Sequence, residues 1–309
     1  MFEWIKKDLL YETREKGWTH ASHPCIIHIA DDIFLIALTK RDSLKKSHIF
    51  LVYAIVKNGM ITLEDKPKLA LSPGDYGYFD CDGVISGCFI KNVDQIYLYY
   101  VGWQNLPEDL WICDTGRANL DLSSLTLEKE FLGPIIGRDR NHPLFAAATA
   151  FFIDENNLWH TWYNSGLKWE KAGSNWKHKY GLHHGTSTNG LDWKFDEGMA
   201  IPFADEYEYA FGRPTVVKWG NRYHMWYAHR ETKYIKTYRI GYASSDDGLK
   251  WTREDENSGI DASEEGWDSK MICYPSVFSH NGFKYMLYNG NGYGETGFGY
   301  AVLEERSNV

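Results

Sequence analysis

Five short segments, rich in apolar and aromatic residues, recur along the chain at a nearly constant distance. Each segment ends a predicted strand, and their last residues are Leu38, Tyr100, Tyr163, Tyr227 and Tyr288. The steps between these end points are 62, 63, 64 and 61 residues. A fixed period of this kind indicates repeated supersecondary units. Five such units account for all 309 residues.

Each unit is predicted to contain four short strands. The fourth unit shows an apolar segment (212–219), an alternating segment (222–230) and a third segment (238–245). The turn signals Gly-Asn (220–221) and Asp-Asp-Gly (246–248) follow the first and third of these segments. Pairs such as Asn-Gly and Asp-Gly indicate hairpins, because type I′ turns need positive φ at both central residues. No long stretch has the 3.6-residue period of a helix.

Four-stranded units repeated around an axis describe a β-propeller. We therefore predict one all-β domain over residues 1–309, a five-bladed β-propeller with four antiparallel strands per blade. The last blade has only three obvious strands, so residues 3–11 are predicted to supply its outer strand and close the ring. Closure removes the exposed sheet edge that would invite aggregation. The predicted blades are 13–66, 67–130, 131–200, 201–260 and 261–303.

Composition narrows the classes of function. Hydrophobic residues make up 43% of the chain and aromatic residues 16%, with 13 Trp and 21 Tyr. Such an aromatic excess suits sheet packing and also suits surfaces on which rings stack against sugars. The formal net charge of −9 argues against a general affinity for nucleic acid or anionic membranes.

Cysteine usage and the N-terminal segment bear on the cellular compartment. The five cysteines are odd in number and form no C-x-x-C motif, so neither a disulfide framework nor a thiolate zinc site is predicted. The N-terminus has no apolar segment of signal-peptide length, and no segment approaches the ~18 apolar residues of a membrane span. We expect a cytoplasmic protein with reduced thiols, no membrane span, no cofactor and no bound metal.

Three motifs resemble those of five-bladed glycosidase propellers, which include glycoside hydrolase families 32, 43, 68 and 130. Segments 187–193 and 245–251 look like the S-x-D-G-x-x-W turn of these proteins. Segment 79–90 resembles the D-x-D-G-x-x-S-G blade of family 32 fructosidases. Segment 208–214 resembles the Glu-x-Pro strand start that carries the acid carboxylate in families 32 and 43. The resemblance implies a propeller with a carbohydrate site in its axial funnel.

The chain departs from this family pattern at two places. The family's first blade opens with Asp-Pro, where this chain has His23-Pro24. The Arg-Asp-Pro of the third blade is missing, and the corresponding strand start is segment 143–150. Two of the three usual catalytic carboxylates are therefore not matched.

Acid–base cleavage of a glycosidic bond needs two carboxylates, roughly 5–5.5 Å apart for retention and further apart for inversion. The candidates are Glu208 as the acid and Asp82 as the base or transition-state stabiliser, with Asp80 as the rival of Asp82. Predicted blades two and four are not adjacent, so these side chains could face each other across the funnel. Alternatively, Asp82 caps a turn and Glu208 forms a surface ion pair with Arg213.

Arg213 lies at a predicted strand start, where its guanidinium could hold a sugar carboxylate or phosphate in a bidentate manner. A structural ion pair is the alternative. The histidines His20, His23 and His142 could together bind an axial metal, act as acid–base groups, or make ordinary polar contacts. The predicted substrate-binding residues are Arg213, His23, His20, Trp103, Tyr274 and Tyr293.

These observations support three hypotheses for the function. The first is a carbohydrate-active enzyme of glycosidase or phosphorylase type that acts on a glycosidic linkage in the axial funnel. The second is a biosynthetic sugar-transferring or sugar-modifying enzyme of bacterial surface-glycan assembly. The third is a non-catalytic carbohydrate-binding propeller. All three predict a carbohydrate or activated-sugar ligand, and fold alone does not choose among them.

Overall fold

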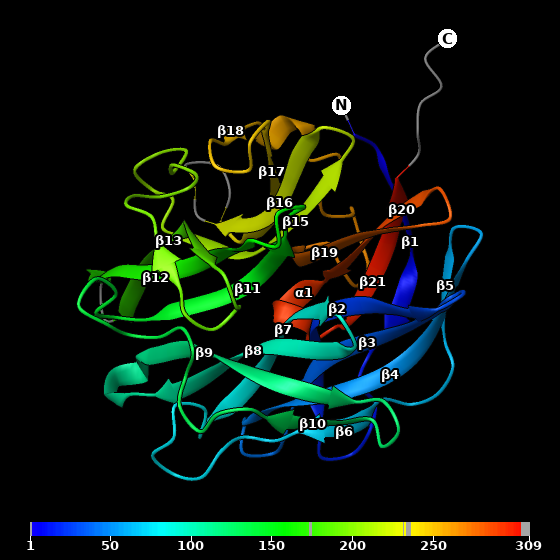
Figure 1. The fold of residues 1–309 in the computed structure, drawn as a ribbon, viewed down its shortest axis with the longest axis horizontal. Coiled ribbons are helices and arrows are strands. Elements are labelled where there is room, and N and C mark those ends of the chain that lie inside the picture. The colour runs from blue at the N-terminus through cyan, green and yellow to red at the C-terminus, as the bar shows by residue number, and fades with distance from the viewer. Residues whose placement is uncertain (1, 173–174, 231, 233–235, 304–309) are drawn as a thin grey trace.

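The computed structural model describes residues 2–172, 175–230, 232 and 236–303. Within these residues the regular secondary structure is almost entirely β-strand (Figure 1). Its helical parts are the 3-10 turns η1 (Pro107–Asp109) and η2 (Asp255–Asn257) and the single turn α1 (Asn291–Gly294). The all-β prediction is therefore confirmed. None of the helices in the described part of the chain has the length and apolar character needed to span a membrane.

Antiparallel pairing joins the strands, in chain order, into successive units. The first unit contains β2 (Thr19–Ala30), β3 (Ile33–Arg41), β4 (Ser47–Lys57), β5 (Met60–Leu63) and β6 (Lys68–Leu71). The second contains β7 (Gly83–Asn92), β8 (Gln95–Asn105), β9 (Trp111–Asp121) and β10 (Thr126–Lys129). The third contains β11 (Ala146–Ile153), β12 (Trp159–Ala172), β13 (Asn175–Ser187) and β14 (Lys194–Phe195). The fourth contains β15 (Ala210–Trp219), β16 (Arg222–Arg230), β17 (Tyr238–Ser245) and β18 (Thr252–Arg253).

The fifth unit combines both ends of the chain. It consists of β19 (Cys273–His280), β20 (Phe283–Asn289), β21 (Phe298–Leu303) and the N-terminal strand β1 (Trp4–Tyr11), in the order β1-β21-β20-β19. The register places Trp4 opposite Leu303 and Ile5 opposite Val302. In Figure 1, the blue strand β1 accordingly lies beside the red strand β21.

The turns follow the sequence signals in part: at the predicted turns 220–221 and 246–248 only Gly220 and Gly248 have positive φ, whereas two other Asn-Gly turns have the full type I′ pattern. The hairpin turns Asn58-Gly59 and Asn281-Gly282 have φ values of +52° and +75°, and of +47° and +80°. Positive φ at both central residues is the type I′ pattern that Asn-Gly favours. In the turn that follows β13, the hydroxyl of Ser187 accepts hydrogen bonds from the backbone N–H groups of residues 189 and 190. The hydroxyl of Ser245 accepts the same pair of bonds from residues 247 and 248.

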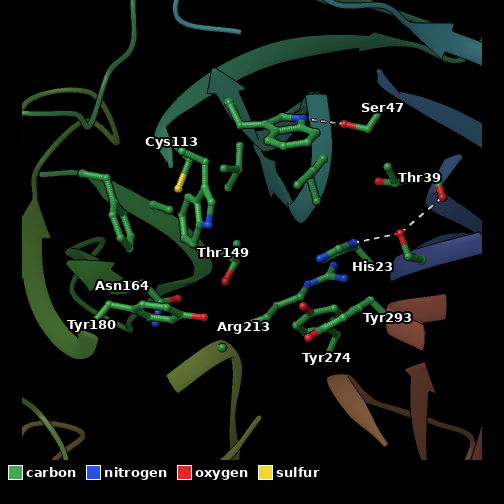
Figure 2. A pocket seen from close by; sticks show the side chains of 18 of the residues that line it. His23, Thr39, Ser47, Cys113, Thr149, Asn164, Tyr180, Arg213, Tyr274 and Tyr293 are labelled. Carbon is green, nitrogen blue, oxygen red and sulfur yellow. Dashed lines mark hydrogen bonds between the residues drawn. The ribbon is translucent and has the colours of Figure 1, made fainter. Parts of the chain in front are cut away.

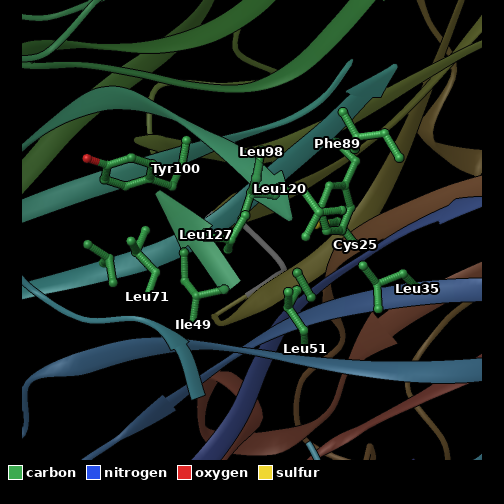
Figure 3. Packing of buried hydrophobic residues seen from close by; sticks show 14 of the residues in the cluster. Cys25, Leu35, Ile49, Leu51, Leu71, Phe89, Leu98, Tyr100, Leu120 and Leu127 are labelled. Atoms are coloured by element: carbon green, nitrogen blue, oxygen red, sulfur yellow. The ribbon is translucent and has the colours of Figure 1, made fainter. Parts of the chain in front are cut away.

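The hydrophobic core lies between neighbouring units. Figure 3 shows how Leu35 and Ile49 of the first unit pack against Phe89, Leu98 and Leu120 of the second. All five side chains are buried, and each contributes about 1.5–3 kcal/mol through removal from water. The faces of both sheets are therefore apolar, which explains why the central strands read as nearly continuous hydrophobic segments.

The repeated tyrosines that mark the sequence period share one environment. Tyr100, Tyr163, Tyr227 and Tyr288 are completely buried within the second strand of their units, which continues beyond the strand end predicted from the sequence. A buried hydroxyl needs a hydrogen-bond partner, and each has one. The partners are Asp80, His142, Asp255 and Asp268, respectively. The period of about 62 residues is thus the period of a buried, hydrogen-bonded tyrosine.

A substitution in the N-terminal strand β1 tests the contribution of this strand to stability. Trp4 is buried, and its ring lies 5.5 Å from that of Trp226 in an edge-to-face arrangement. We expect Trp4→Ala to lower the free energy of unfolding by about 3–5 kcal/mol, as for other buried tryptophans. The half-exposed neighbour Ile5 provides the control, because Ile5→Ala should cost less than about 1 kcal/mol. Urea unfolding of both variants measures this, and equal midpoints would contradict it.

Candidate functional site

The first strand of every unit is interrupted at the same point. A register shift occurs in β2, β7, β11, β15 and β19, between residues 22/25, 86/88, 148/150, 212/215 and 273/276, respectively. At three of these bulges the residue before a proline has positive φ, namely His23 (+52°), Arg213 (+32°) and Tyr274 (+57°). Such backbone is unfavourable for a residue with a side chain and is concentrated at functional sites.

The bulged strands converge on a cavity of about 400 Å³ (Figure 2). Its polar lining includes three arginines, one histidine and four tyrosines: Arg41, Arg213, Arg230, His23, Tyr180, Tyr238, Tyr274 and Tyr293. Trp103, Trp111, Thr39, Thr149 and Asn164 add aromatic rings and hydrogen-bonding groups. None of the described residues that line this cavity is an aspartate or a glutamate. The lining is therefore cationic and aromatic.

Arg213 extends from the bulge of β15 to the bulge of β7 in another unit. Its Nη2 donates a hydrogen bond of 2.7 Å to the carbonyl oxygen of Gly87. Residue 87 must be glycine, because a Cβ there would lie 2.4 Å from the carbonyl oxygen of Tyr99. Burial lowers the pKa of Arg213, although a guanidinium remains charged near neutral pH.

His23 lies beside Arg213 in the same cavity. Its ring stacks on that of Tyr274, with 4.2 Å between the ring centroids, and its Nδ1 contacts the hydroxyl of Ser22 at 2.9 Å. Its backbone N–H donates to Oδ1 of Asn289, 2.8 Å away in β20. Burial, together with the charge of Arg213, lowers the pKa of His23, so the ring is neutral at pH 7.

A second polar cluster is formed by side chains of the third, fourth and fifth units. The hydroxyls of Tyr180 and Tyr238 lie 2.6 Å apart. Nη1 of Arg230 donates to the hydroxyl of Tyr293 at 2.9 Å. Burial raises the pKa of Tyr180 and Tyr238, so both are neutral hydroxyls that can donate to and accept from a ligand.

Five of the six predicted substrate-binding residues meet at this cavity: Arg213, His23, Trp103, Tyr274 and Tyr293. The sixth, His20, lies outside the lining, with its Nδ1 3.0 Å from the hydroxyl of Thr19. His142 contacts Asp139 and Tyr163, which is one of the repeated buried tyrosines. Across the described residues, no group of three or more His, Cys, Asp or Glu side chains is arranged to hold a metal ion.

The three predicted catalytic carboxylates are not among the residues that line the cavity. Asp80 is buried, forms an ion pair of 2.7 Å with Lys129 and accepts the hydroxyl of Tyr100. Asp82 is partly exposed, and its Oδ2 accepts the backbone N–H of Asn105 at 2.8 Å. Both aspartates thus have structural contacts, and their catalytic roles stay predictions.

Glu208 is completely buried in a network of its own. Arg253 binds both of its carboxylate oxygens, at 2.7 and 2.8 Å, and His229 contacts it at 2.9 Å. The predicted surface ion pair with Arg213 is absent among the described contacts, and Arg253 takes that place. In a Glu-x-Pro motif that ends at Pro214, the glutamate position corresponds to Gly212, which lines the cavity.

Several residues of the lining were not anticipated from the sequence. Arg41 and Arg230 end the second strands of their units, Tyr238 begins the third strand of its unit, and Tyr180 lies within the third strand of its unit. The repeat itself carries the missing signal, because these strand ends adjoin the bulged first strands. The recurrence of Xaa-Pro at residues 23–24, 213–214 and 274–275, in step with the period, points to the same place.

Several solved structures with a similar fold are glycoside hydrolases. One described as "Glycoside hydrolase" has a TM-score of 0.74 at 16% identity and covers 99% of this chain and 93% of its own. A thermostable family-43 glycoside hydrolase gives 0.66 at 16% identity, with 95% and 91% covered. The GH43_1 enzyme from Xanthomonas citri, complexed with xylose, gives 0.63 at 13% identity, with 94% and 88% covered. The chain has the fold of the propeller glycosidases.

Relatives in sequence come from Mycobacterium tuberculosis. Uncharacterized protein MT1551 and Uncharacterized protein Rv1502 are each 34% identical to this chain over 292 residues, which is 94% of this chain and 95% of each relative. The chain therefore belongs to the same family as these two mycobacterial proteins. A scan against protein-family models gives no match.

The buried Glu208–Arg253 pair predicts a specific pH dependence of stability. Burial alone would raise the pKa of Glu208, but the hydrogen bonds from Arg253 and His229 lower it from 4.5 to about 2. Because the folded pKa is depressed, this stabilisation is complete above about pH 4.5 and is lost as the pH falls through 2. At 1.36 kcal/mol per unit, it amounts to about 3 kcal/mol.

We therefore expect Glu208→Gln to be less stable than the wild type at pH 7 by about 3 kcal/mol. The difference should shrink between pH 4.5 and pH 2, because a protonated glutamate is equivalent to glutamine. Chemical denaturation as a function of pH measures this. Glu206→Gln, at an exposed neighbouring position, serves as the control and should match the wild type throughout. A pH-independent difference for Glu208→Gln would contradict the assignment.

Proposed function

We propose that this protein is a carbohydrate-active protein whose axial cavity binds a saccharide. The fold is proposed to be a five-bladed β-propeller in which each antiparallel unit is one blade and β1 closes the ring. The observation that carries the proposal is the cavity at the convergence of the bulged first strands, which is lined by aromatic rings and hydrogen-bond donors. The glycoside hydrolase fold supports a carbohydrate as the ligand.

The dimensions and chemistry of the cavity suit a small saccharide. Small-molecule sites typically enclose ~300–1,000 Å³ and combine apolar walls with a few placed polar groups. Trp103 and Trp111 provide flat apolar faces for a sugar ring, and Asn164 and Tyr180 provide groups that can bind its hydroxyls. Strand-borne side chains of this kind are held in place before the ligand arrives, which lowers the entropic cost of binding.

Among the three hypotheses from the sequence, the geometry favours those that do not need a carboxylate pair in the cavity. Hydrolysis of a glycosidic bond ordinarily uses two carboxylates on either side of the bond, and the described lining contains none. We therefore propose saccharide recognition, either by a sugar-transferring or sugar-modifying enzyme or by a binding protein. A cytoplasmic location, inferred from the unpatterned cysteines, belongs to the same proposal.

A second candidate is cleavage of a glycosidic linkage with Glu208 as the acid and Asp82 or Asp80 as the base. The likeness to glycoside hydrolases favours it. It requires Glu208 to carry a proton near neutral pH, whereas Arg253 keeps its pKa at about 2. The substrate would have to displace Arg253 from Glu208 before this residue could act as an acid.

A tryptophan substitution tests the proposed site. We expect Trp111→Ala to weaken saccharide binding at least ~5-fold, because truncation of a central aromatic contact usually costs more than about 1 kcal/mol. Titration with a panel of mono- and disaccharides, followed by calorimetry, measures the affinity. The control is Trp219→Ala, which alters a tryptophan outside the cavity lining that donates to Ser279. Equal loss in both variants would argue against this cavity as the site.

The same panel, presented as aryl glycosides, separates the two candidate functions. The proposed function predicts binding without release of the aryl group by the wild type. Release that falls at least ~100-fold in both Asp82→Asn and Glu208→Gln would instead support the carboxylate mechanism, since general acid–base catalysis contributes at least about that much.

A further inference from the structure

Arg213 carries a buried positive charge that no described carboxylate neutralises. The residue is 4% exposed, and its Nη2 is bound to the carbonyl oxygen of Gly87. Its Nη1 has no hydrogen-bond partner among the described residues, and no described Asp or Glu forms an ion pair with it. A charge removed from water is unfavourable unless it is paired and hydrogen-bonded. Arg213 is therefore incompletely satisfied in the free protein.

Other buried cations of the chain have a carboxylate partner. Lys40 pairs with Glu15, Arg117 with Glu130, and Arg253 with Glu208. These residues show how the fold ordinarily accommodates a buried charge. Arg213 departs from that rule at a position that lines the cavity and whose backbone is held in a strained conformation. Strain and an unpaired charge at the same residue indicate a role in binding a ligand rather than in stability.

The surroundings of Arg213 strengthen the positive potential. Arg41 and Arg230 also line the cavity, whereas the chain as a whole has a formal net charge of −9. His23, which stands next to Arg213, is neutral, so the positive charge at the cavity comes from the arginines, while His23 contributes a polar ring. A cleft that gathers one sign of charge within low-dielectric walls attracts a ligand of the opposite sign.

We propose that the saccharide bound in this cavity carries an anionic group, a carboxylate or a phosphate, and that this group binds the guanidinium of Arg213. This inference rests on the proposed function. The guanidinium matches the geometry of both groups, because its N–H donors are arranged as a planar fork. The anion supplies the countercharge that the protein itself lacks around Arg213, and Arg41 and Arg230 contribute further attraction.

Three sugars of the same configuration distinguish a carboxylate from a phosphate as the anionic group of the ligand. They are neutral galactose, galacturonate and galactose 1-phosphate, and inorganic phosphate is a fourth probe. We expect the wild type to bind galacturonate or galactose 1-phosphate at least ~10-fold more tightly than galactose, because a charge-assisted hydrogen bond contributes about that much. Preference for galacturonate identifies a uronic acid, and preference for galactose 1-phosphate identifies a sugar phosphate. Calorimetry at low salt measures the affinities.

The variant Arg213→Gln should lose the preference for the anionic sugar. The matched control is Arg140→Gln, which removes the same charge from an exposed arginine outside the cavity lining and should retain the preference. Arg213→Gln should also melt no lower than the wild type without ligand, because it removes an unpaired buried charge. A purely structural role for Arg213 would instead lower the melting temperature. Arg213→Lys keeps the charge and provides a second test, with intermediate affinity expected.

The outcomes separate this inference from the proposed function. Binding of galactose with the same affinity as the anionic sugars, unchanged in Arg213→Gln, overturns the anionic ligand and leaves the saccharide site standing. Binding of inorganic phosphate alone, with none of the sugars bound, overturns the proposed function. Loss of thermal stability in Arg213→Gln, with the preference for the anionic sugar retained, assigns Arg213 a structural role and overturns the inference.

Discussion

The structure depends on how the bulged first strands satisfy their backbone polar groups where the units converge. A bulge removes ladder hydrogen bonds, and buried backbone groups left without partners are costly. The chain solves this with side chains from adjacent units. Thr39 accepts the backbone N–H of Ser86, Asn164 donates to the carbonyl of Phe211, and Asn289 donates to the carbonyl of Ala21. Thr39, Asn164 and Asn289 directly follow Leu38, Tyr163 and Tyr288, the last residues of three repeated segments. The same period therefore organises both the core and these hydrogen bonds between units.

The same constraint creates the cavity. The extra residue of a β-bulge has its side chain turned out of the alternating pattern of the strand. In this structure the bulge side chains turn toward the place where the units meet. His23, Arg213 and Tyr274 are such residues, and all three line the cavity. The backbone around them is held by hydrogen bonds from other units, such as the one from His23 to Asn289. The candidate site is therefore held in place from more than one unit, and its chemistry depends on which residue occupies each bulge.

The sequence predicts the fold better than the site, for a physical reason. The buried tyrosines Tyr100, Tyr163, Tyr227 and Tyr288 recur with the spacing of the units, so their recurrence reveals the repeated unit. A carboxylate next to a strand can either act on a ligand or cap such a tyrosine. Asp80 lies in a motif that resembles a catalytic one, yet it binds the hydroxyl of Tyr100. Asp268, which lies in no such motif, does the same for Tyr288. Local sequence cannot separate the catalytic role from the structural role, because the two roles differ in which residues surround the carboxylate in the folded structure.

Pairing of β1 with β21 imposes an order of events on synthesis. Trp4 is opposite Leu303 in the finished sheet, so β1 is synthesised well before its partner β21. At about 5–20 residues per second, the delay is roughly 15–60 s. Throughout this time β1 is an unpaired edge on a nascent chain. Its centre is Lys6-Lys7-Asp8, and charged residues of this kind discourage pairing with other chains. The polarity of this strand therefore protects the growing polypeptide until its own C-terminal strand arrives.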